Sequence, residues 1–113
     1  MSNNYSYSQL YYDNAEFAVT PGASNYDVFA NQSALTTNFG VDSNGNTLPG
    51  GNFATKAVIR TDGTITVKFN STSADAITVT SADSPFTMDK LVITKIYISS
   101  TAGANVKILL KEE

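Results

Sequence analysis

The sequence predicts an all-β protein: an antiparallel two-sheet β-sandwich, jelly-roll-like, with an extended N-terminal arm. Apolar residues make up 42% of the 113 residues and charged residues only 15%, and most of the remainder is Thr, Ser and Asn. Thr favours half-buried pleated surfaces, whereas Ser and Asn favour turns. Short segments rich in Val, Ile, Thr and aromatic residues recur between turn signals, as in sandwiches and barrels. This length suits a single domain with one core.

The N-terminal half begins with an arm and continues with short strands. Residues 1–14 are polar and rich in Tyr and show no sustained period, so we expect an extended arm ahead of one sandwich domain over residues 15–113. Strands are predicted over Glu16–Thr20, Tyr26–Ala30 and, more weakly, Leu35–Phe39, with Pro21 and Gly22 stopping the first. Single turns of helix at Ala15–Ala18 and Asn31–Leu35 are the alternatives.

The C-terminal half carries a clearer strand pattern. Its segments are rich in β-branched and aromatic residues and alternate between apolar and polar side chains. The predicted strands are Phe53–Arg60, Thr64–Asn70, Ala76–Thr80, Lys90–Ser99 and Asn105–Lys111.

The stretch RTDGT, residues 60–64, predicts a hairpin with the three-residue loop Thr61-Asp62-Gly63. This register pairs Arg60 with Thr64 and separates an apolar face from a charged one, whereas a two-residue turn would mix them. The apolar face holds Ala57, Ile59, Ile65, Val67 and Phe69, and the other face holds Lys56, Val58, Arg60, Thr64, Thr66 and Lys68. Gly63 then occupies the left-handed position of such a loop.

The stretch SSTAGAN, residues 99–105, predicts a second hairpin with a three-residue loop. A loop of Thr101-Ala102-Gly103 pairs Ser100 with Ala104 and places Gly103 at the left-handed position. Counting outward, Ile98 is opposite Val106 and Ile96 is opposite Ile108, with Lys95, Lys107 and Lys111 on the other face.

Leu91 and Ile93 fall out of phase with Ile96 and Ile98 along the predicted Lys90–Ser99 strand. Because side chains alternate strictly along a regular strand, a bulge near Thr94 and Lys95, or burial on both faces, is expected there.

Missing residue types and segments limit the function. The chain has no Cys and no His, which removes thiolate chemistry and the commonest general base and transition-metal ligand. Its first residues have neither an apolar stretch nor a positive charge, so we expect no signal peptide. No apolar run approaches the roughly 18 residues that span a bilayer, so no membrane partner is expected.

Charge is unevenly placed along the chain. Residues 1–55 carry four acids and no base, whereas residues 56–113 carry seven bases and six acids. Neither half forms a basic patch suited to phosphates, so nucleic-acid binding is not expected.

The stretch VDSNGNTLPGGN, residues 41–52, partly resembles a calcium loop. Asp42, Asn44 and Asn46 occupy its first, third and fifth positions, but Thr47 stands where Gly is needed and Phe53 where Glu is needed. We therefore interpret the segment as an exposed connection that can serve as a contact surface, and we expect no metal and no cofactor.

No catalytic residues are predicted, and the chain is not expected to be an enzyme. Asp75, Asp83 and Asp89 lie in or beside predicted loops, where Asp commonly bonds its own backbone. Nothing in the spacing places an acid pair across a cleft, as glycoside hydrolysis needs, and no nucleophile elbow or phosphate-binding glycine motif occurs. A hydrolase is thus the weakest functional hypothesis for this chain, behind the two binding roles described below.

The four N-terminal tyrosines are the candidate partner-binding residues of the arm: Tyr5, Tyr7, Tyr11 and Tyr12. Tyr offers large contact area at small entropic cost. Two interpretations remain open. The arm can be a tail or fold back on its own sandwich, or it can be ordered by a neighbouring subunit that buries the rings.

The stretch KAVIRTDGTITVKFNSTSADAITVTSADSPFTMDKLVITKIYISSTAGANVKILL resembles small β-sandwich structural proteins of tailed bacteriophages. The resemblance rests on the TDGTITVKFN segment, the SPF and KIYI segments and the final glycine turn, and it covers residues 56–110. It implies a head-decoration, cement or fibre-base protein, often trimeric, made in the host cytoplasm and found in the virion.

This resemblance implies the major capsid protein or sister subunits as partners. The arm or the acidic half would contact the shell or a sister subunit, and the glycine-turn loops would face outward. The alternative is a carbohydrate- or host-surface-binding module of a tail or fibre. It would need exposed aromatic rings, and in a chain without Trp these would be Tyr26, Tyr97 or the arm tyrosines.

Overall fold

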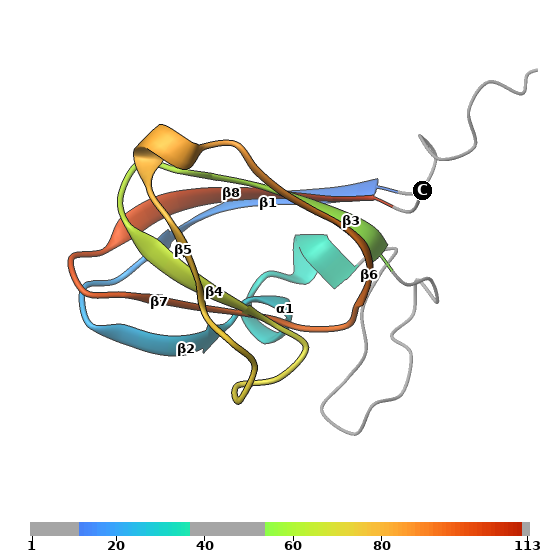
Figure 1. Ribbon diagram of the computed structural model, residues 1–113, viewed down its shortest axis with the longest axis horizontal. Coiled ribbons are helices and arrows are strands. Elements are labelled where there is room, and N and C mark those ends of the chain that lie inside the picture. Colours follow the sequence, from blue (N-terminus) through green and yellow to red (C-terminus); the bar gives the residue numbers. More distant parts are fainter. Residues whose placement is uncertain (1–11, 37–53, 112–113) are drawn as a thin grey trace, which may run out of the picture.

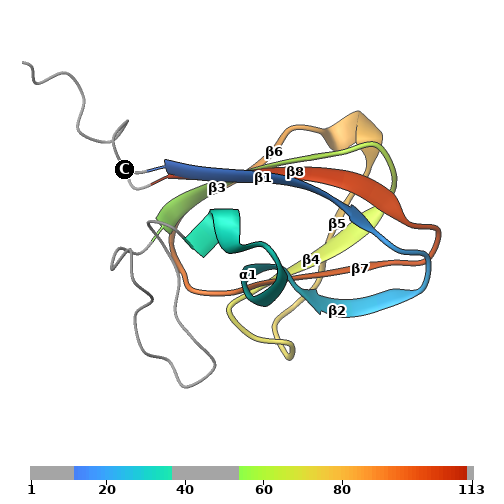
Figure 2. The ribbon, with the colours of Figure 1, turned by 180° about the vertical axis from the view of Figure 1, so that it is seen from behind.

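The computed structural model describes residues 12–36 and 54–111, which form two antiparallel four-stranded sheets (Figure 1). The first sheet has the order β1 (Tyr12–Val19), β8 (Ala104–Lys111), β3 (Ala54–Thr61), β6 (Phe86–Ile93). The second sheet has the order β2 (Ala23–Asp27), β7 (Ile96–Ser100), β4 (Ile65–Phe69), β5 (Ile77–Val79). Figures 1 and 2 show the sheets as two stacked layers, which confirms the predicted β-sandwich.

The strands pair in a nested order along the chain. β1 pairs with β8, β2 with β7, β3 with β6 and β4 with β5, in each case antiparallel. Of the described strands, only β4 and β5 are both consecutive in sequence and paired, and every other consecutive pair is split between the two sheets. A long hairpin rolled into two layers in this way is a jelly roll. The predicted jelly-roll character follows from this order.

The core lies between the sheets because each strand buries alternate side chains. In β4, Ile65, Val67 and Phe69 are buried, whereas Thr66 and Lys68 are partly exposed. Burying one such aliphatic or aromatic side chain stabilises the fold by about 1.5–3 kcal/mol. The largest fully buried side chains are Leu35, Ile59, Ile65, Ile93, Ile96, Ile98, Ile108, Leu110, Val28, Val67 and Val79.

The two predicted hairpins are wrong about which strands pair, but right about which side chains of each strand are buried. β3 and β4, and likewise β7 and β8, lie in different sheets, so the turns at Asp62 and at Gly103 connect the layers. Ile59 and Ile65 are both buried, as are Ile98 and Val106, but they meet across the core. A strand with one apolar face can bury it against the opposite sheet as well as beside a neighbour, so alternation alone does not choose the partner.

The two loop glycines differ in backbone conformation. Gly103 has φ +85°, the left-handed conformation that the sequence predicts. Gly63 is not among the residues with positive φ, so its predicted left-handed conformation is wrong. The reason is that residues 62–64 cross between layers and need not close a hairpin.

The predicted strand Lys90–Ser99 is two strands, β6 and β7, on different sheets. The phase change at Thr94 and Lys95 is real, but it marks the crossing from one layer to the other. β6 also starts earlier than predicted, at Phe86, and its register against β3 shifts between Ala54 and Lys56.

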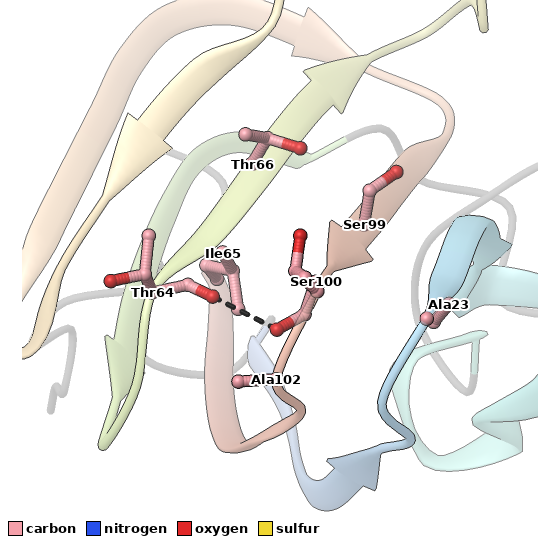
Figure 3. Close-up of a pocket in the computed structure, with 9 residues that line it drawn as sticks. Ala23, Thr64, Ile65, Thr66, Ser99, Ser100 and Ala102 are labelled. Carbon is pink, nitrogen blue, oxygen red and sulfur yellow. Dashed lines mark hydrogen bonds between the residues drawn. The ribbon is translucent and has the colours of Figure 1, made fainter.

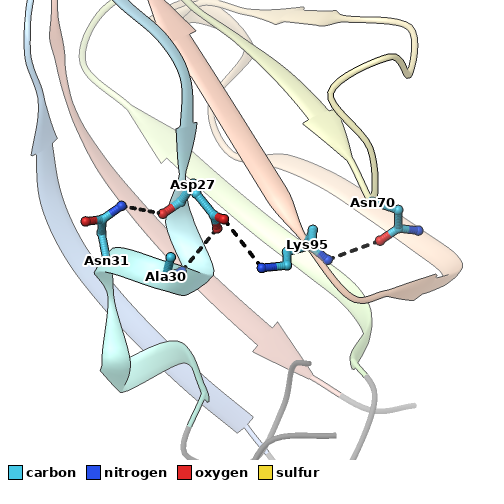
Figure 4. A network of polar contacts seen from close by, with 5 residues as sticks. All are labelled: Asp27, Ala30, Asn31, Asn70 and Lys95. Carbon is cyan, nitrogen blue, oxygen red and sulfur yellow. Dashed lines mark hydrogen bonds and ion pairs between the residues drawn. The ribbon is translucent and has the colours of Figure 1, made fainter. Parts of the chain in front are cut away.

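Asn70 holds this crossing in place from the end of β4. Its Oδ1 accepts hydrogen bonds from the Thr94 N–H (2.7 Å), the Thr94 hydroxyl (3.2 Å) and the Lys95 N–H (3.2 Å), and its Nδ2 donates to the Val92 carbonyl (2.8 Å). Figure 4 shows the Asn70–Lys95 contact, together with the ion pair between Lys95 Nζ and Asp27 Oδ2 at 3.4 Å. One asparagine and one ion pair thus tie β4, β7 and β2 together.

The N-terminal half departs most from expectation. β1 begins at Tyr12, so residues 12–14 of the expected arm pair with β8, and residues 1–11 lie outside the described part of the chain. The expected Tyr26–Ala30 strand ends at Asp27, whose carboxylate caps the short helix α1 (Val28–Asn31) by accepting from the Ala30 N–H at 3.1 Å. The expected strand at Leu35 is replaced by the 3-10 helix η2 (Ser33–Thr36).

α1 and η2 close one side of the sandwich, where Figure 2 shows them between the layers. α1 contacts β7, η2 contacts β1, and Val28, Phe29 and Leu35 are buried in the core. Within residues 12–36 and 54–111, no helix has the length and apolar character needed to cross a bilayer.

Candidate functional site

Asp62 joins the connection between β3 and β4 to the start of β8. Its Oδ1 accepts from the Asn105 N–H at 2.7 Å and its Oδ2 from the Asn105 Nδ2 at 2.8 Å, while its own N–H donates to the Asn105 carbonyl at 3.2 Å. These bonds from the Asn105 backbone and side chain stabilise the carboxylate and hold the pKa of Asp62 below its ordinary value. The Asp62 carboxylate is therefore used for structure, although the residue is exposed.

Gly63 and Gly103 lie where three connections pack together. A Cβ on Gly103 would come within 3.0 Å of both Pro21 Cδ and the Val19 carbonyl oxygen, and one on Gly63 would come within 3.1 Å of the Gly103 carbonyl oxygen. Gly22 donates its N–H to the Ser100 carbonyl at 2.9 Å. The connections at residues 20–22, 62–64 and 101–103 are therefore tightly packed around Gly63 and Gly103.

The arm tyrosines are placed only in part. Tyr12 is the first residue of β1 and is opposite Lys111 in the register, and Tyr5, Tyr7 and Tyr11 lie outside the described residues. The segment 41–52, weighed above as a calcium loop, also lies outside them.

The acids of the N-terminal half do not form one surface. Asp13 is buried, at 6% exposure, Glu16 is exposed on β1, and Asp27 is paired with Lys95. Asp42 is outside the described residues. The charge asymmetry of the sequence therefore does not become an acidic patch on the described part of the molecule.

The three loop aspartates are dispersed. Asp83 ends the 3-10 helix η3 (Ser81–Asp83), and its Oδ2 accepts from the Thr80 N–H and hydroxyl at 3.1 and 2.9 Å, which is the turn role expected for it. Asp89 lies on β6, opposite Lys56 of β3. Asp75 is exposed and precedes β5. Among the described residues, no group of three Asp, Glu, His or Cys side chains is placed to hold a metal ion.

The outer face of the first sheet brings together residues that the sequence leaves apart. Val58 and Leu109 are opposite each other at its centre and line a hollow of about 300 Å³ with Asn14, Arg60 and Lys107. On one side of this apolar pair Arg60 is opposite Lys107, and on the other side Lys56 is opposite Lys111. We call the six residues on β3 and β8 the basic face: Lys56, Val58, Arg60, Lys107, Leu109 and Lys111.

The basic face has an acid at each edge of its sheet. Glu16 of β1 is opposite Lys107, and Asp89 of β6 is opposite Lys56. The rows across the sheet therefore read Glu16–Lys107–Arg60 and Lys111–Lys56–Asp89, so in each row two cations are adjacent. Like charges directly opposite on neighbouring strands destabilise a sheet by a few tenths of a kcal/mol to about 1 kcal/mol.

Local sequence signals could not find this face. The alternation within residues 56–60 does place Lys56, Val58 and Arg60 together, and that within residues 105–111 separates the lysines from the isoleucines. What no turn or spacing indicates is that β3 and β8, far apart in the chain, are hydrogen-bonded neighbours.

The second sheet carries a hollow of about 310 Å³ between β4 and the end of β7 (Figure 3). Its lining includes Thr64, Thr66, Ser99, Ser100 and Thr101, which makes it rich in hydroxyls. Some of these groups are already bonded: Ser100 Oγ donates to the Thr64 carbonyl at 2.9 Å, and Ser99 Oγ accepts from the Asn25 N–H at 2.9 Å.

The two tyrosines considered for glycan binding have different environments. Tyr26 stacks on Phe17 with ring centroids 5.7 Å apart, and its hydroxyl accepts from Gln32 Nε2 at 2.8 Å, so it belongs to the packing of the sandwich. Tyr97 lies between buried Ile96 and Ile98, so it points to the outer side of the second sheet, and it is partly exposed.

Comparison of the chain with protein-family models, with curated proteins and with solved structures finds no significant match.

Proposed function

We propose that this chain is a virion structural protein, a capsid decoration (cement) or head-fibre protein that binds the shell and stabilises it through subunit contacts. In this proposal it is not an enzyme. Its partners are the major capsid protein, sister subunits or both, and the favoured assembly is a homotrimer in the virion.

The observation that carries the proposal is the jelly-roll sandwich with one sheet face that combines an apolar centre and charged surroundings. Jelly rolls build virus shell proteins and lectins, so the fold supports the class by analogy. A sheet face with an apolar centre and charged surroundings is the kind of surface that protein partners bury. The resemblance of residues 56–110 to phage structural proteins points the same way.

The copy number of the chain in purified particles tests this proposal. A decoration protein occupies every equivalent site on the shell, so we expect hundreds of copies per particle by quantitative mass spectrometry. Particles that hold one or two copies contradict the decoration role, and particles without the chain contradict the virion assignment altogether.

The second candidate is a carbohydrate- or host-surface-binding module of a tail or fibre. The hydroxyl-lined hollow on the second sheet favours it, because Thr and Ser side chains can bond sugar hydroxyls, and Tyr97 lies on the same sheet face. A glycan array with the native chain and the Tyr97→Ala variant decides it. Binding that the variant loses supports this candidate, and an array without hits removes it.

A further inference from the structure

We propose that the basic face is the contact surface of this chain, and that its occupant is an acidic protein surface with an apolar residue among its carboxylates. The inference rests on the proposed function, because it names the part of the molecule that meets the shell. Its elements are the Val58–Leu109 centre and the cation pairs on either side.

Charge placement is the first argument. Four of the seven basic residues of the chain lie on this one face, on the two central strands. The two acids on the outer face of this sheet, Glu16 and Asp89, lie on the edge strands β1 and β6. The Asp62 carboxylate near the end of β3 is bonded to Asn105. The centre of the face is thus positive, and complementary charge is what selects and orients a partner.

The sheet's own stability gives the second argument. Arg60 opposite Lys107 is a like-charge pair, which is unfavourable in the isolated molecule. Glutamate at Arg60 would make this row alternate in sign, as Glu16–Lys107–Glu. Arg60 is therefore a poor choice for the fold alone, and an acidic partner is a condition that makes it favourable.

The same charges argue against a second copy as the occupant. In a two-fold contact the same patch lies on both subunits. With the axis at the centre of this face, the β3 and β8 cations of one copy would meet those of the other. A trimer uses a heterologous contact, in which the basic face would meet a different patch of the next subunit. The acids of the described N-terminal half form no acidic patch to receive it, so the basic face remains for a different protein.

Size limits the strength of one contact. Four strands of eight residues cover roughly 19 by 26 Å, or about 500 Å², from the standard strand spacing and rise. A stable protein complex usually buries about 800 Å² on each partner. One basic face alone therefore gives a weak contact, and firm attachment needs several copies bound together, as a trimer on a shell provides.

The first experiment uses the full-length chain in solution and a defined probe. The probe is a short capped peptide with glutamates on both sides of an apolar pair, and its control carries glutamines. We expect the glutamate peptide to shift NMR signals along β3 and β8, with binding lost in about 1 M salt, where the screening length is about 3 Å.

Two variants and one matched control sharpen the test. Arg60→Glu/Lys111→Glu should weaken peptide binding about tenfold. Lys68→Glu, a similar reversal on the second sheet, should bind as the native chain does. Arg60→Gln/Lys111→Gln replaces the first variant if that variant is less stable than expected.

Three results overturn the inference: no saturable binding of the glutamate peptide, signal shifts centred on the second sheet, or equal binding by the Arg60→Glu/Lys111→Glu variant. A single-stranded oligonucleotide of matched charge is a further arm. Tighter binding of the oligonucleotide than of the peptide would assign the face to nucleic acid and contradict an acidic protein partner.

A parallel assay on empty capsid shells separates this inference from the proposed function. Shells that bind the native chain and all variants equally leave the decoration role standing and overturn the basic face as its contact. Shells that bind none of them, together with peptide binding at β3 and β8, overturn the decoration role and leave the face as an acidic-protein site.

Discussion

At the scale of single residues, the polar side chains near the turns act mainly on the backbone. Asp62 binds Asn105, Asp83 binds Thr80, and Asn70 binds Thr94 and Lys95. Each bond joins a turn to a neighbouring strand end. At these three turns the Asn and Asp side chains therefore serve to fix the connections of the sandwich.

Asp62 makes stability depend on pH in the acid range. Its pKa is lowered in the folded state, so its contribution is present above its ordinary pKa of 3.8 and is lost as the pH falls through the lower folded value. We expect the native chain to unfold at a higher temperature than Asp62→Asn at pH 6, with the difference shrinking as the pH falls below 3.8. A constant difference from pH 6 to pH 2 would contradict this role.

Gly103 and Gly22 form a matched pair for testing the packed end of the sandwich. Both have positive φ, +85° and +80°, but a Cβ on Gly22 meets nothing within 4 Å. Gly22→Ala should therefore cost about 1 kcal/mol of unfolding free energy from backbone strain alone. Gly103→Ala should cost about 3 kcal/mol, because its Cβ also crowds Pro21 and Val19.

Chemical denaturation of both variants measures this difference. Equal losses for Gly22→Ala and Gly103→Ala would mean that the connections at residues 20–22 and 101–103 are not in the close contact described. Gly63→Ala is a third comparison, since its φ is not positive and only the approach to Gly103 and Ala104 opposes it.

At the scale of strands and turns, the alternation of apolar and polar residues predicts which face of a strand is buried. It does not predict which strand lies beside it. The predicted strands over residues 53–60, 64–70, 76–80 and 105–111 agree with β3, β4, β5 and β8 to within about two residues. The buried faces predicted on either side of the turns at Gly63 and Gly103 are also correct, because a one-sided apolar pattern needs burial whatever covers it. The pairing fails because a glycine turn after a strand can close a hairpin or cross to the other layer, and the local residues suit both.

The break between β6 and β7 shows the same limit. The phase change between Ile93 and Ile96 is visible in the sequence, but a bulge and a change of sheet produce the same local pattern. What decides it is Asn70, a residue more than twenty positions away that bonds the crossing. Long-range contacts of this kind leave no local signature.

Asn70 offers a test of that crossing. Its φ of 73° is easy for Gly and costly for Ala, so Asn70→Gly removes the side-chain bonds without adding backbone strain. We expect a loss of about 2 kcal/mol for Asn70→Gly and about 3 kcal/mol for Asn70→Ala. Denaturant unfolding gives both values, and a loss under about 0.5 kcal/mol for Asn70→Gly would mean that its hydrogen bonds do not hold the crossing.

At the scale of the whole molecule, the nested strand order brings β3 and β8 together and so creates the basic face. The sequence shows that the basic residues are confined to positions 56–113, but it does not show that four of them share one face. The candidate contact surface is therefore a property of the topology, which a single sequence does not reveal.

The arrangement of charges on this face predicts that a charge reversal can raise the stability of the isolated chain while it weakens partner binding. Arg60→Glu turns the row at Lys107 into alternating signs, so the isolated chain should gain about 0.5 kcal/mol of stability. Thermal unfolding of the variant and the native chain at low salt measures it. A clear loss of stability would mean that Arg60 supports the fold by a contact other than those described.

Lysine labelling of the chain on intact particles tests the central claim most directly. The reagent is applied to free chain and to particle-bound chain, and the extent of modification at each lysine is compared by mass spectrometry. The account predicts that Lys56, Lys107 and Lys111 are protected on the particle while Lys68, on the second sheet, is modified to the same extent in both states. Protection of Lys68 with unchanged labelling of the three lysines on the basic face would contradict it.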